Sequence, residues 1–108
     1  MYKVLFICSQ NRLRSPTAET IFGTWPNVEA QSTGLHHDAE NPVTPEDLMW
    51  AEIIFVMEKG HKSKLSKKFG KYLRAKRIIC LDIPDNYDYM DPTLVKLLET
   101  RVAPFLRS

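Results

Sequence analysis

The chain contains only two cysteines among its 108 residues, Cys8 and Cys80. No CxxC pair is present, so the sequence indicates neither a disulfide framework nor a cysteine-based metal site. No apolar run approaches the ~20 residues of a membrane span, and no charged start with an apolar stretch precedes the first expected strand. We therefore expect a protein of the reducing cytoplasm that has no contact with a membrane.

Intrinsic disorder and a multidomain organisation are also excluded by what the sequence lacks. It contains no internal repeat, linker or low-complexity segment, and 44% of its residues are hydrophobic and 10% aromatic. Such a composition is too apolar for a disordered chain. A chain of this length can bury one hydrophobic core. We predict a single domain over residues 1–108.

Charge is distributed unevenly, although the net charge is only +2. Nine of the fifteen Lys and Arg residues lie between Lys59 and Arg77, where no carboxylate occurs. We call residues 59–77 the basic segment. It could bind nucleic acid or an acidic phosphoprotein, but charge runs on a helix are usually solvated faces. Only Phe69 and Tyr72 interrupt the cations as aromatic residues, which disfavours nucleic-acid binding.

Four short runs rich in apolar, β-branched and aromatic residues predict buried strands. They are residues 2–7, 28–32, 52–57 and 77–81. Because helical patterns separate these runs, we predict a three-layer α-β-α fold around a four-stranded parallel sheet. Ligands of such folds bind beyond the carboxyl ends of the strands, where the strand order reverses.

Three of the predicted helices begin with a capping residue followed by proline, a favoured helix start. These starts are Ser15-Pro16, Thr44-Pro45 and Asp91-Pro92. The fourth helix lies in the basic segment, where Leu65, Phe69 and Leu73 recur every four residues. We expect Pro104 to end or kink the last helix. Residues 35–43 are polar and predict a loop.

The loop after the first strand, residues 8–15, has the features of an oxyanion site. Successive backbone N–H groups in a tight strand-to-helix loop form an anion-sized nest. The N-terminus of the following helix adds unpaired donors. Arg14 can complete the ring, because its planar guanidinium matches two oxygens of a phosphate. Inorganic phosphate or a similar oxyanion is the predicted ligand.

Cys8 lies at the base of this loop. The dipoles that attract a phosphate also stabilise a thiolate, which is the nucleophilic form of cysteine. Ser15 could donate a hydrogen bond to the sulfur, and Asn11 suits a left-handed backbone conformation that would brace the loop. Cysteine is also a common core residue, but the position between a strand and a proline-started helix favours the functional interpretation.

Residues 7–19 read Ile-Cys-Ser-Gln-Asn-Arg-Leu-Arg-Ser-Pro-Thr-Ala-Glu. They resemble the signature of the low-molecular-weight protein tyrosine phosphatases, which have Cys-x5-Arg-Ser-Pro after the first strand. Three further segments resemble that family in the same order along nearly the whole chain: Ser32-Thr33-Gly34, Phe55-Val56-Met57-Glu58 and Asp82-Ile83-Pro84-Asp85-Asn86-Tyr87.

The resemblance implies a protein tyrosine phosphatase that hydrolyses phosphate monoesters through a phosphocysteine, without a metal or other cofactor. Its substrate would be a phosphate monoester or a phosphotyrosine protein. The implied catalytic residues are Cys8, Arg14, Asp85 and Ser15. The implied substrate-binding residues are Ser9, Gln10, Asn11, Arg12, Leu13, Arg14 and Tyr87.

The general acid has a separate argument from the residues. The reaction needs a carboxyl group above the nest, and the loop after the fourth strand reaches the same edge of the sheet. Asp85 fits this position best, and Asp88 stays open as the alternative. Asp91 is better explained as the cap of the last helix, and Asp82 lies close to the strand.

The sequence departs from the family pattern at several positions near the site. Gln10 replaces a usual glycine, Leu13 replaces the usual second cysteine, and Asn86 replaces a proline. The helix that the family places between its second and third strands is reduced to residues 35–43. The resemblance therefore does not indicate which substrate this protein prefers.

Three other functions are compatible with parts of the sequence. Arsenate reduction on the same fold needs two further cysteines, and only Cys80, in an apolar strand, is available. A phosphocysteine carrier would hold the phosphoryl group rather than hydrolyse it, whereas Arg14 and an aspartate after the fourth strand favour turnover. A nucleic-acid-binding module would use the basic segment.

Overall fold

The computed structural model describes residues 2–106, and a single parallel sheet forms its centre. The strands are β1 (Tyr2–Cys8), β2 (Val28–Gly34), β3 (Ile53–Val56) and β4 (Arg77–Cys80), and their order is β2-β1-β3-β4. The strand order reverses beside β1, because β2 and β3 pair with its two edges. The predicted four-stranded parallel sheet is confirmed.

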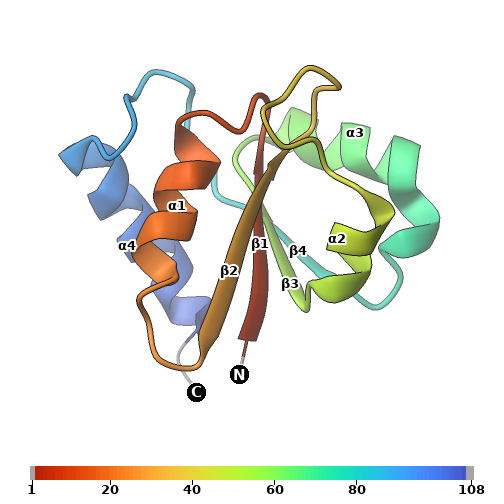
Figure 1. Cartoon of the computed structure of the whole chain (residues 1–108), viewed down its shortest axis with the longest axis horizontal. Helices are drawn as coiled ribbons and strands as arrows, with labels where there is room; N and C mark the ends of the chain where they lie inside the picture. The colour runs from red at the N-terminus through yellow and green to blue at the C-terminus, as the bar shows by residue number, and fades with distance from the viewer. Residues whose placement is uncertain (1, 107–108) are drawn as a thin grey trace.

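Helices cover both faces of the sheet (Figure 1). One face carries α1 (Arg14–Phe22) and α4 (Pro92–Leu106), and the other carries α2 (Pro45–Trp50) and α3 (Lys59–Phe69). A short 3₁₀ turn, η1 (Gly70–Tyr72), follows α3. The arrangement has the three predicted layers.

Successive side chains of β1 point to opposite faces of the sheet, so the strand contributes to a hydrophobic core on each face. Val4 and Phe6 belong to the cluster beneath α1 and α4, whereas Leu5 and Ile7 belong to the cluster beneath α2 and α3. All four side chains are fully buried, which stabilises the fold by about 1.5–3 kcal/mol for each large apolar side chain. Because both faces of the strand are covered, its sequence is continuously apolar rather than alternating.

Two strands extend further toward the carboxyl edge than predicted, and two are shorter. β1 reaches Cys8 and β2 reaches Gly34, and these two residues are paired in register. β3 covers only Ile53–Val56, and β4 ends at Cys80. The chain still follows β3 beyond Cys80, because the Leu81 N–H donates to the carbonyl of Val56 over 2.9 Å.

The prediction that Ser15 caps the first helix is wrong. α1 begins two residues earlier than predicted, at Arg14 rather than Pro16, and Leu13 occupies the cap position. Pro16 then lies third in the helix. Its lack of an N–H costs no intrahelical hydrogen bond there, because the first four N–H groups of a helix have no partner within it. Ser15 does not act as a cap because its hydroxyl is turned toward Cys8.

The other predicted helix starts are confirmed. The Thr44 hydroxyl accepts a hydrogen bond from the Asp47 N–H, and the Asp47 carboxylate accepts one from the Thr44 N–H. At the start of α4, the Thr93 N–H donates to the Asp91 carboxylate over 2.8 Å. Both contacts satisfy backbone donors that a helix N-terminus leaves unpaired.

Two helix ends differ from the prediction. Pro104 does not end α4, which continues to Leu106, because Val102, Ala103 and Leu106 are buried against the core and hold the last turn in place. In the basic segment the α-helix ends at Phe69, and Leu73 reaches the core only after the 3₁₀ turn.

None of the helices within residues 2–106 combines the length and the apolar composition that crossing a bilayer requires.

Candidate active site

The loop between β1 and α1 encloses a cavity of about 200 Å³. Its lining comes from the segment that follows β1 and from Asp85 in the loop after β4, so it lies at the carboxyl edge of the sheet. Seven residues line it: Cys8, Ser9, Gln10, Arg12, Leu13, Arg14 and Asp85. All seven belong to the set predicted from the sequence. The predicted residues Asn11, Ser15 and Tyr87 do not line it.

Cys8 is buried at the end of β1, and a hydrogen-bonded chain of side chains lies behind its sulfur. Ser15 Oγ lies 2.9 Å from Cys8 Sγ, and Asn11 Nδ2 donates to the same Ser15 oxygen over 3.0 Å. Asn11 has a φ of 56°, so the predicted left-handed conformation is confirmed. The Ser15 hydroxyl can also donate to the Thr33 carbonyl, over the longer distance of 3.3 Å. When Cys8 is ionised, the nearer and charged sulfur is the stronger acceptor, and Asn11 still holds the serine oxygen.

The Arg14 guanidinium is buried and fixed along one edge. Its Nη1 donates to Glu58 Oε2 over 2.6 Å and to the Ile83 carbonyl over 2.7 Å. A guanidinium has five N–H groups, so these two bonds leave the donors of Nε and Nη2. Arg14 also lines the cavity. The second edge is therefore available for two oxygens of a tetrahedral oxyanion.

Asp85 lies at the mouth of the cavity. Its Oδ1 is 3.7 Å from Arg14 Nε, and its side chain is 61% exposed. Neither Asp82 nor Asp88 lines the cavity. Asp82 has a φ of 53° and its carbonyl accepts a hydrogen bond from Arg101. Of the three aspartates, the geometry favours Asp85 as the carboxyl group above Cys8.

Glu58 is a site residue to which the sequence reasoning assigned no role. It follows β3 and reaches the site by its 2.6 Å contact with Arg14. The hydrogen bond from Arg14 lowers the pKa of Glu58, against the opposing effect of desolvation, and the charges of Arg14, His61 and Lys64 lower it further. The sequence could have indicated this role, because Glu58 follows the strand that pairs with β1, and the carboxyl ends of parallel strands lie at one edge of the sheet.

His61 is the second residue that the sequence reasoning did not assign. It lies in the first turn of α3 and is buried. Its Nδ1 accepts a hydrogen bond from the Glu58 N–H, and its Nε2 lies 2.9 Å from Ser9 Oγ. Burial lowers the pKa of His61, and the nearby Arg14 adds to this effect, although Glu58 and Asp85 oppose it. The neutral ring is therefore favoured.

Residues 35–43 form a loop without a helix, as predicted, and this loop supports the cavity wall. The Leu35 N–H donates to the Cys8 carbonyl, the His36 N–H to Ser9 and the Glu40 N–H to Gln10, over 2.8, 3.0 and 3.1 Å. The carbonyl groups of Cys8, Ser9 and Gln10 are thereby hydrogen-bonded to the 35–43 loop.

Tyr87 and Tyr89, in the loop after β4, lie outside the cavity lining. Tyr87 is half-buried against the core beneath α1 and α4. Tyr89 is half-exposed, and its hydroxyl lies 2.8 Å from Thr20 Oγ1. A role of Tyr87 in substrate binding stays a prediction.

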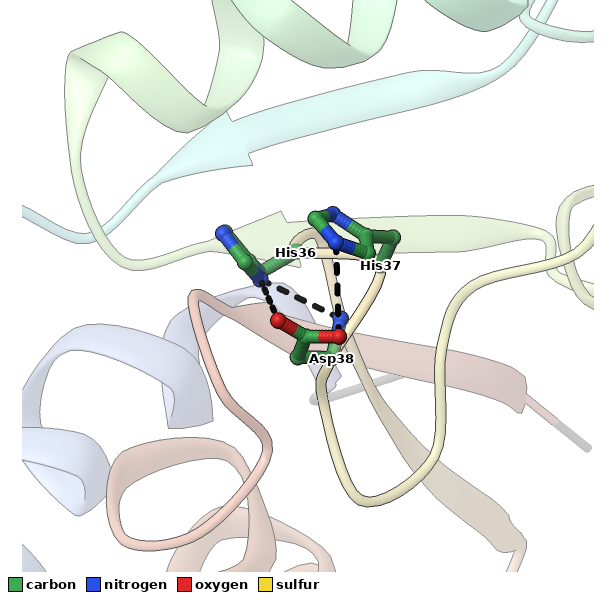
Figure 2. A group of neighbouring side chains, drawn as sticks. All are labelled: His36, His37 and Asp38. Atoms are coloured by element: carbon green, nitrogen blue, oxygen red, sulfur yellow. Dashed lines mark hydrogen bonds and ion pairs between the residues drawn. The ribbon is translucent and has the colours of Figure 1, made fainter.

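His36, His37 and Asp38 form an exposed cluster on the 35–43 loop (Figure 2). The two rings stack with centroids 4.5 Å apart, and the Asp38 carboxylate lies to one side of both, 3.9 Å from His36 Nδ1 and 3.3 Å from His37 Nε2. The Asp38 N–H donates to His36 Nδ1 over 3.1 Å. These groups have metal-binding chemistry, but the nitrogen of His36 nearest the carboxylate is already an acceptor for a backbone donor.

Cys80 is half-buried in β4, and β3 lies between it and β1. Its Sγ donates to Asp82 Oδ1 over 3.6 Å. Both cysteines are free thiols, and the sheet keeps Cys80 away from a relay with Cys8.

No protein-family model and no curated protein sequence matches the chain. Solved structures do match it closely in shape. The low-molecular-weight protein tyrosine phosphatase SP-PTP of Streptococcus pyogenes superposes with a TM-score of 0.79 at 16% identity, over 100% of this chain and 95% of that one. This chain has the low-molecular-weight protein tyrosine phosphatase fold.

Two further structures show how this phosphatase fold is shared. Wzb of Vibrio vulnificus, in complex with benzylphosphonate, has a TM-score of 0.77 at 22% identity and covers 96% of both chains. The YwlE arginine phosphatase of Geobacillus stearothermophilus has a TM-score of 0.75 at 21% identity, over 98% of this chain and 93% of that one. The low-molecular-weight phosphatase fold thus occurs in proteins named for two different phosphorylated residues.

Proposed function

We propose that the protein hydrolyses phosphate monoesters, phosphotyrosine among them, through a phosphocysteine on Cys8. The observation that carries the proposal is the cavity itself. A buried sulfur lies at its base, a fixed guanidinium on its wall and a carboxyl group at its mouth. This arrangement supplies a nucleophile, an oxyanion cradle and a proton donor around one phosphate-sized space.

In the first step, Cys8 Sγ attacks phosphorus and the bond to the leaving oxygen breaks. The backbone N–H groups of residues 9–13 and the free edge of Arg14 hold the equatorial oxygens, so that the developing charge meets preorganised donors. Asp85, in its protonated form, gives a proton to the leaving oxygen. The products are a phosphocysteine and an alcohol or phenol.

In the second step, Asp85 accepts a proton from a water molecule, whose oxygen attacks the phosphocysteine. The S–P bond breaks, inorganic phosphate is released and the sulfur leaves as a thiolate. Ser15, 2.9 Å from the sulfur, donates a hydrogen bond to this thiolate. Such a bond to an ionised acceptor is stronger than a neutral one, so it improves the sulfur as a leaving group.

The position of Asp85 also favours hydrolysis over a phosphocysteine carrier. A carrier has no use for an acid and base within reach of the phosphoryl group. Here the Asp85 carboxylate is 3.7 Å from the arginine that binds the phosphoryl oxygens. Turnover of a simple aryl phosphate by the purified protein separates the two functions.

The assignment of the general acid predicts a dependence on the leaving group. Asp85→Asn should lower the rate of the first step by about 10²- to 10⁴-fold for a phenyl phosphate. The loss should be smaller for a nitrophenyl phosphate, because its anion leaves without a proton. Single-turnover kinetics with both esters measures this difference.

Asp88→Asn is the matched control, since Asp88 lies on the same loop and outside the cavity lining. It should keep the wild-type rate with both esters. If Asp88→Asn shows the leaving-group dependence and Asp85→Asn does not, the acid is Asp88.

A further inference from the structure

A second cavity, of about 120 Å³, lies beside the first, and both are lined by Ser9. We propose that it is an anion-binding subsite for a carboxylate that flanks the phosphotyrosine of a peptide substrate. The proposal rests on the proposed function and adds a substrate class to it, namely acidic phosphopeptides. The cavity is lined by Ser9, Leu35, His36, His61 and Lys64.

The lining contains hydrogen-bond donors and a cation but no carboxylate. Lys64 is exposed on α3 and carries an ammonium group with three donors. The phosphate cavity differs in this respect, because Asp85 belongs to its lining. A carboxylate in the second cavity would therefore be attracted by Lys64, and no acidic residue of the lining would repel it.

The hydrogen bonds of His61 leave the proton of the Ser9 hydroxyl free for a ligand. Since His61 Nδ1 accepts from the Glu58 N–H, the neutral ring carries its proton on Nε2. That proton is donated to Ser9 Oγ, 2.9 Å away. The Ser9 hydroxyl must then direct its own proton elsewhere, and it has no other hydrogen-bond partner among residues 2–106. Ser9 thus offers a donor to a ligand.

His36 supplies a third donor by the same argument. Its Nδ1 accepts from the Asp38 N–H over 3.1 Å, so in the neutral ring the proton lies on Nε2. Figure 2 shows Nε2 directed away from Asp38. Residues that carry hydroxyl, imidazole and ammonium donors therefore line one small cavity from three separate segments.

Two carboxylates contact residues of this cavity. Glu58 bonds Arg14 over 2.6 Å and its Oε2 also lies 3.8 Å from His61 Nε2, whereas Asp38 pairs with His36 and His37 on its own loop. Neither lines the cavity. Because Ser9 lines both cavities, one peptide substrate can place its phosphate against Cys8 and a neighbouring group in the second cavity.

The test compares short phosphotyrosine peptides that differ only in the flanking residues, Glu in one and Gln in the other. The wild-type protein should hydrolyse the Glu peptide with a kcat/KM about threefold to fivefold higher, as expected of one exposed charge pair. Lys64→Ala should bring this ratio close to one, and Lys64→Glu should invert it. Raising the ionic strength should reduce the wild-type ratio.

Lys62→Ala is the matched control, because it removes the same charge from α3. Lys62 is exposed but lies about 200° around the helix from Lys64. It should keep the wild-type ratio. A wild-type ratio near one, or equal effects of the two lysine variants, would overturn the subsite.

Binding of the same peptides to Cys8→Ser, measured by calorimetry, separates the subsite from the reaction. Tighter binding of the Glu peptide that depends on Lys64 supports the subsite even if the wild-type protein has no phosphatase activity. Equal binding of the two peptides overturns the subsite even if the protein is an active phosphatase.

Discussion

Ser15 shows at the scale of one residue why a local motif and its structural role can differ. Serine before proline is typical of a helix cap, yet the Ser15 hydroxyl lies against Cys8 Sγ and accepts from Asn11. The cap rule considers only neighbours in the sequence. The role of Ser15 depends on β1, which brings Cys8 alongside the first turn of α1, and the sequence predicted that contact only through the chemistry of the sulfur.

Thr33 offers a stability test behind the site. Its Oγ1 is the one buried side-chain nitrogen or oxygen without a hydrogen-bond partner among the residues described, 2–106. A buried unsatisfied hydroxyl costs about 1–3 kcal/mol. Thr33→Val, which keeps the shape and removes this group, should raise the free energy of unfolding by about 1 kcal/mol in urea denaturation.

Thr33→Ser is the control for this prediction. It keeps the hydroxyl and removes a methyl group, so it should be less stable than the wild type because it leaves a small void. A Val variant that is as unstable as the Ser variant would show that the Thr33 hydroxyl is satisfied in solution.

At the scale of elements, the sequence predicted which loops meet at the carboxyl edge of the sheet. It did not predict the side-chain contacts between those loops. Apolar runs placed Cys8 at the end of the first strand and Asp85 in the loop after the fourth, and parallel strands bring their carboxyl ends to one edge of the sheet. The contacts of Glu58 with Arg14 and of His61 with Ser9 join segments 44 and 52 residues apart. Such pairs follow from strand order and register, which a single sequence specifies only indirectly.

Gly34 shows how tightly β2 approaches the Cys8 loop. A Cβ on Gly34 would collide with the Ala39 side chain and come within 2.9 Å of the Ser9 carbonyl and 3.0 Å of the Asn11 nitrogen. Gly34→Ala should therefore displace the loop, lower the free energy of unfolding by about 1–3 kcal/mol and reduce kcat/KM for an aryl phosphate. Urea denaturation and steady-state kinetics measure the two effects.

The control is Gly60→Ala, because a Cβ at Gly60 meets no atom within 4 Å. This change on an exposed position of α3 should leave activity intact and slightly increase stability. If Gly34→Ala behaves like Gly60→Ala, the loop does not depend on the close approach of β2.

For the whole molecule, His61 links the site to the pH dependence of folding. Because burial lowers its pKa in the folded state from the ordinary value of 6.5, the unfolded chain binds a proton more readily. Stability should therefore fall as the pH drops below about 6.5, until the folded-state pKa is reached. Thermal denaturation between neutral and acidic pH measures this loss.

His61→Gln should show a weaker loss of stability over the same pH window. Glu58 acts at lower pH: the pKa of this carboxyl is lowered from 4.5 by Arg14, so its stabilisation is lost only as the pH falls through that lowered value. NMR titration of the His61 ring in the wild-type protein checks the assignment, and a ring that titrates above 6.5 contradicts it.

The covalent step on Cys8 is the central claim, and trapping the intermediate tests it most directly. The protein is mixed with an aryl phosphate, quenched within one turnover and digested, and the masses of its cysteine peptides are measured. We predict one phosphoryl group on the peptide that contains Cys8 and none on the peptide that contains Cys80. Turnover of the ester without a phosphoryl group on Cys8, together with undiminished activity of Cys8→Ser, would contradict the account.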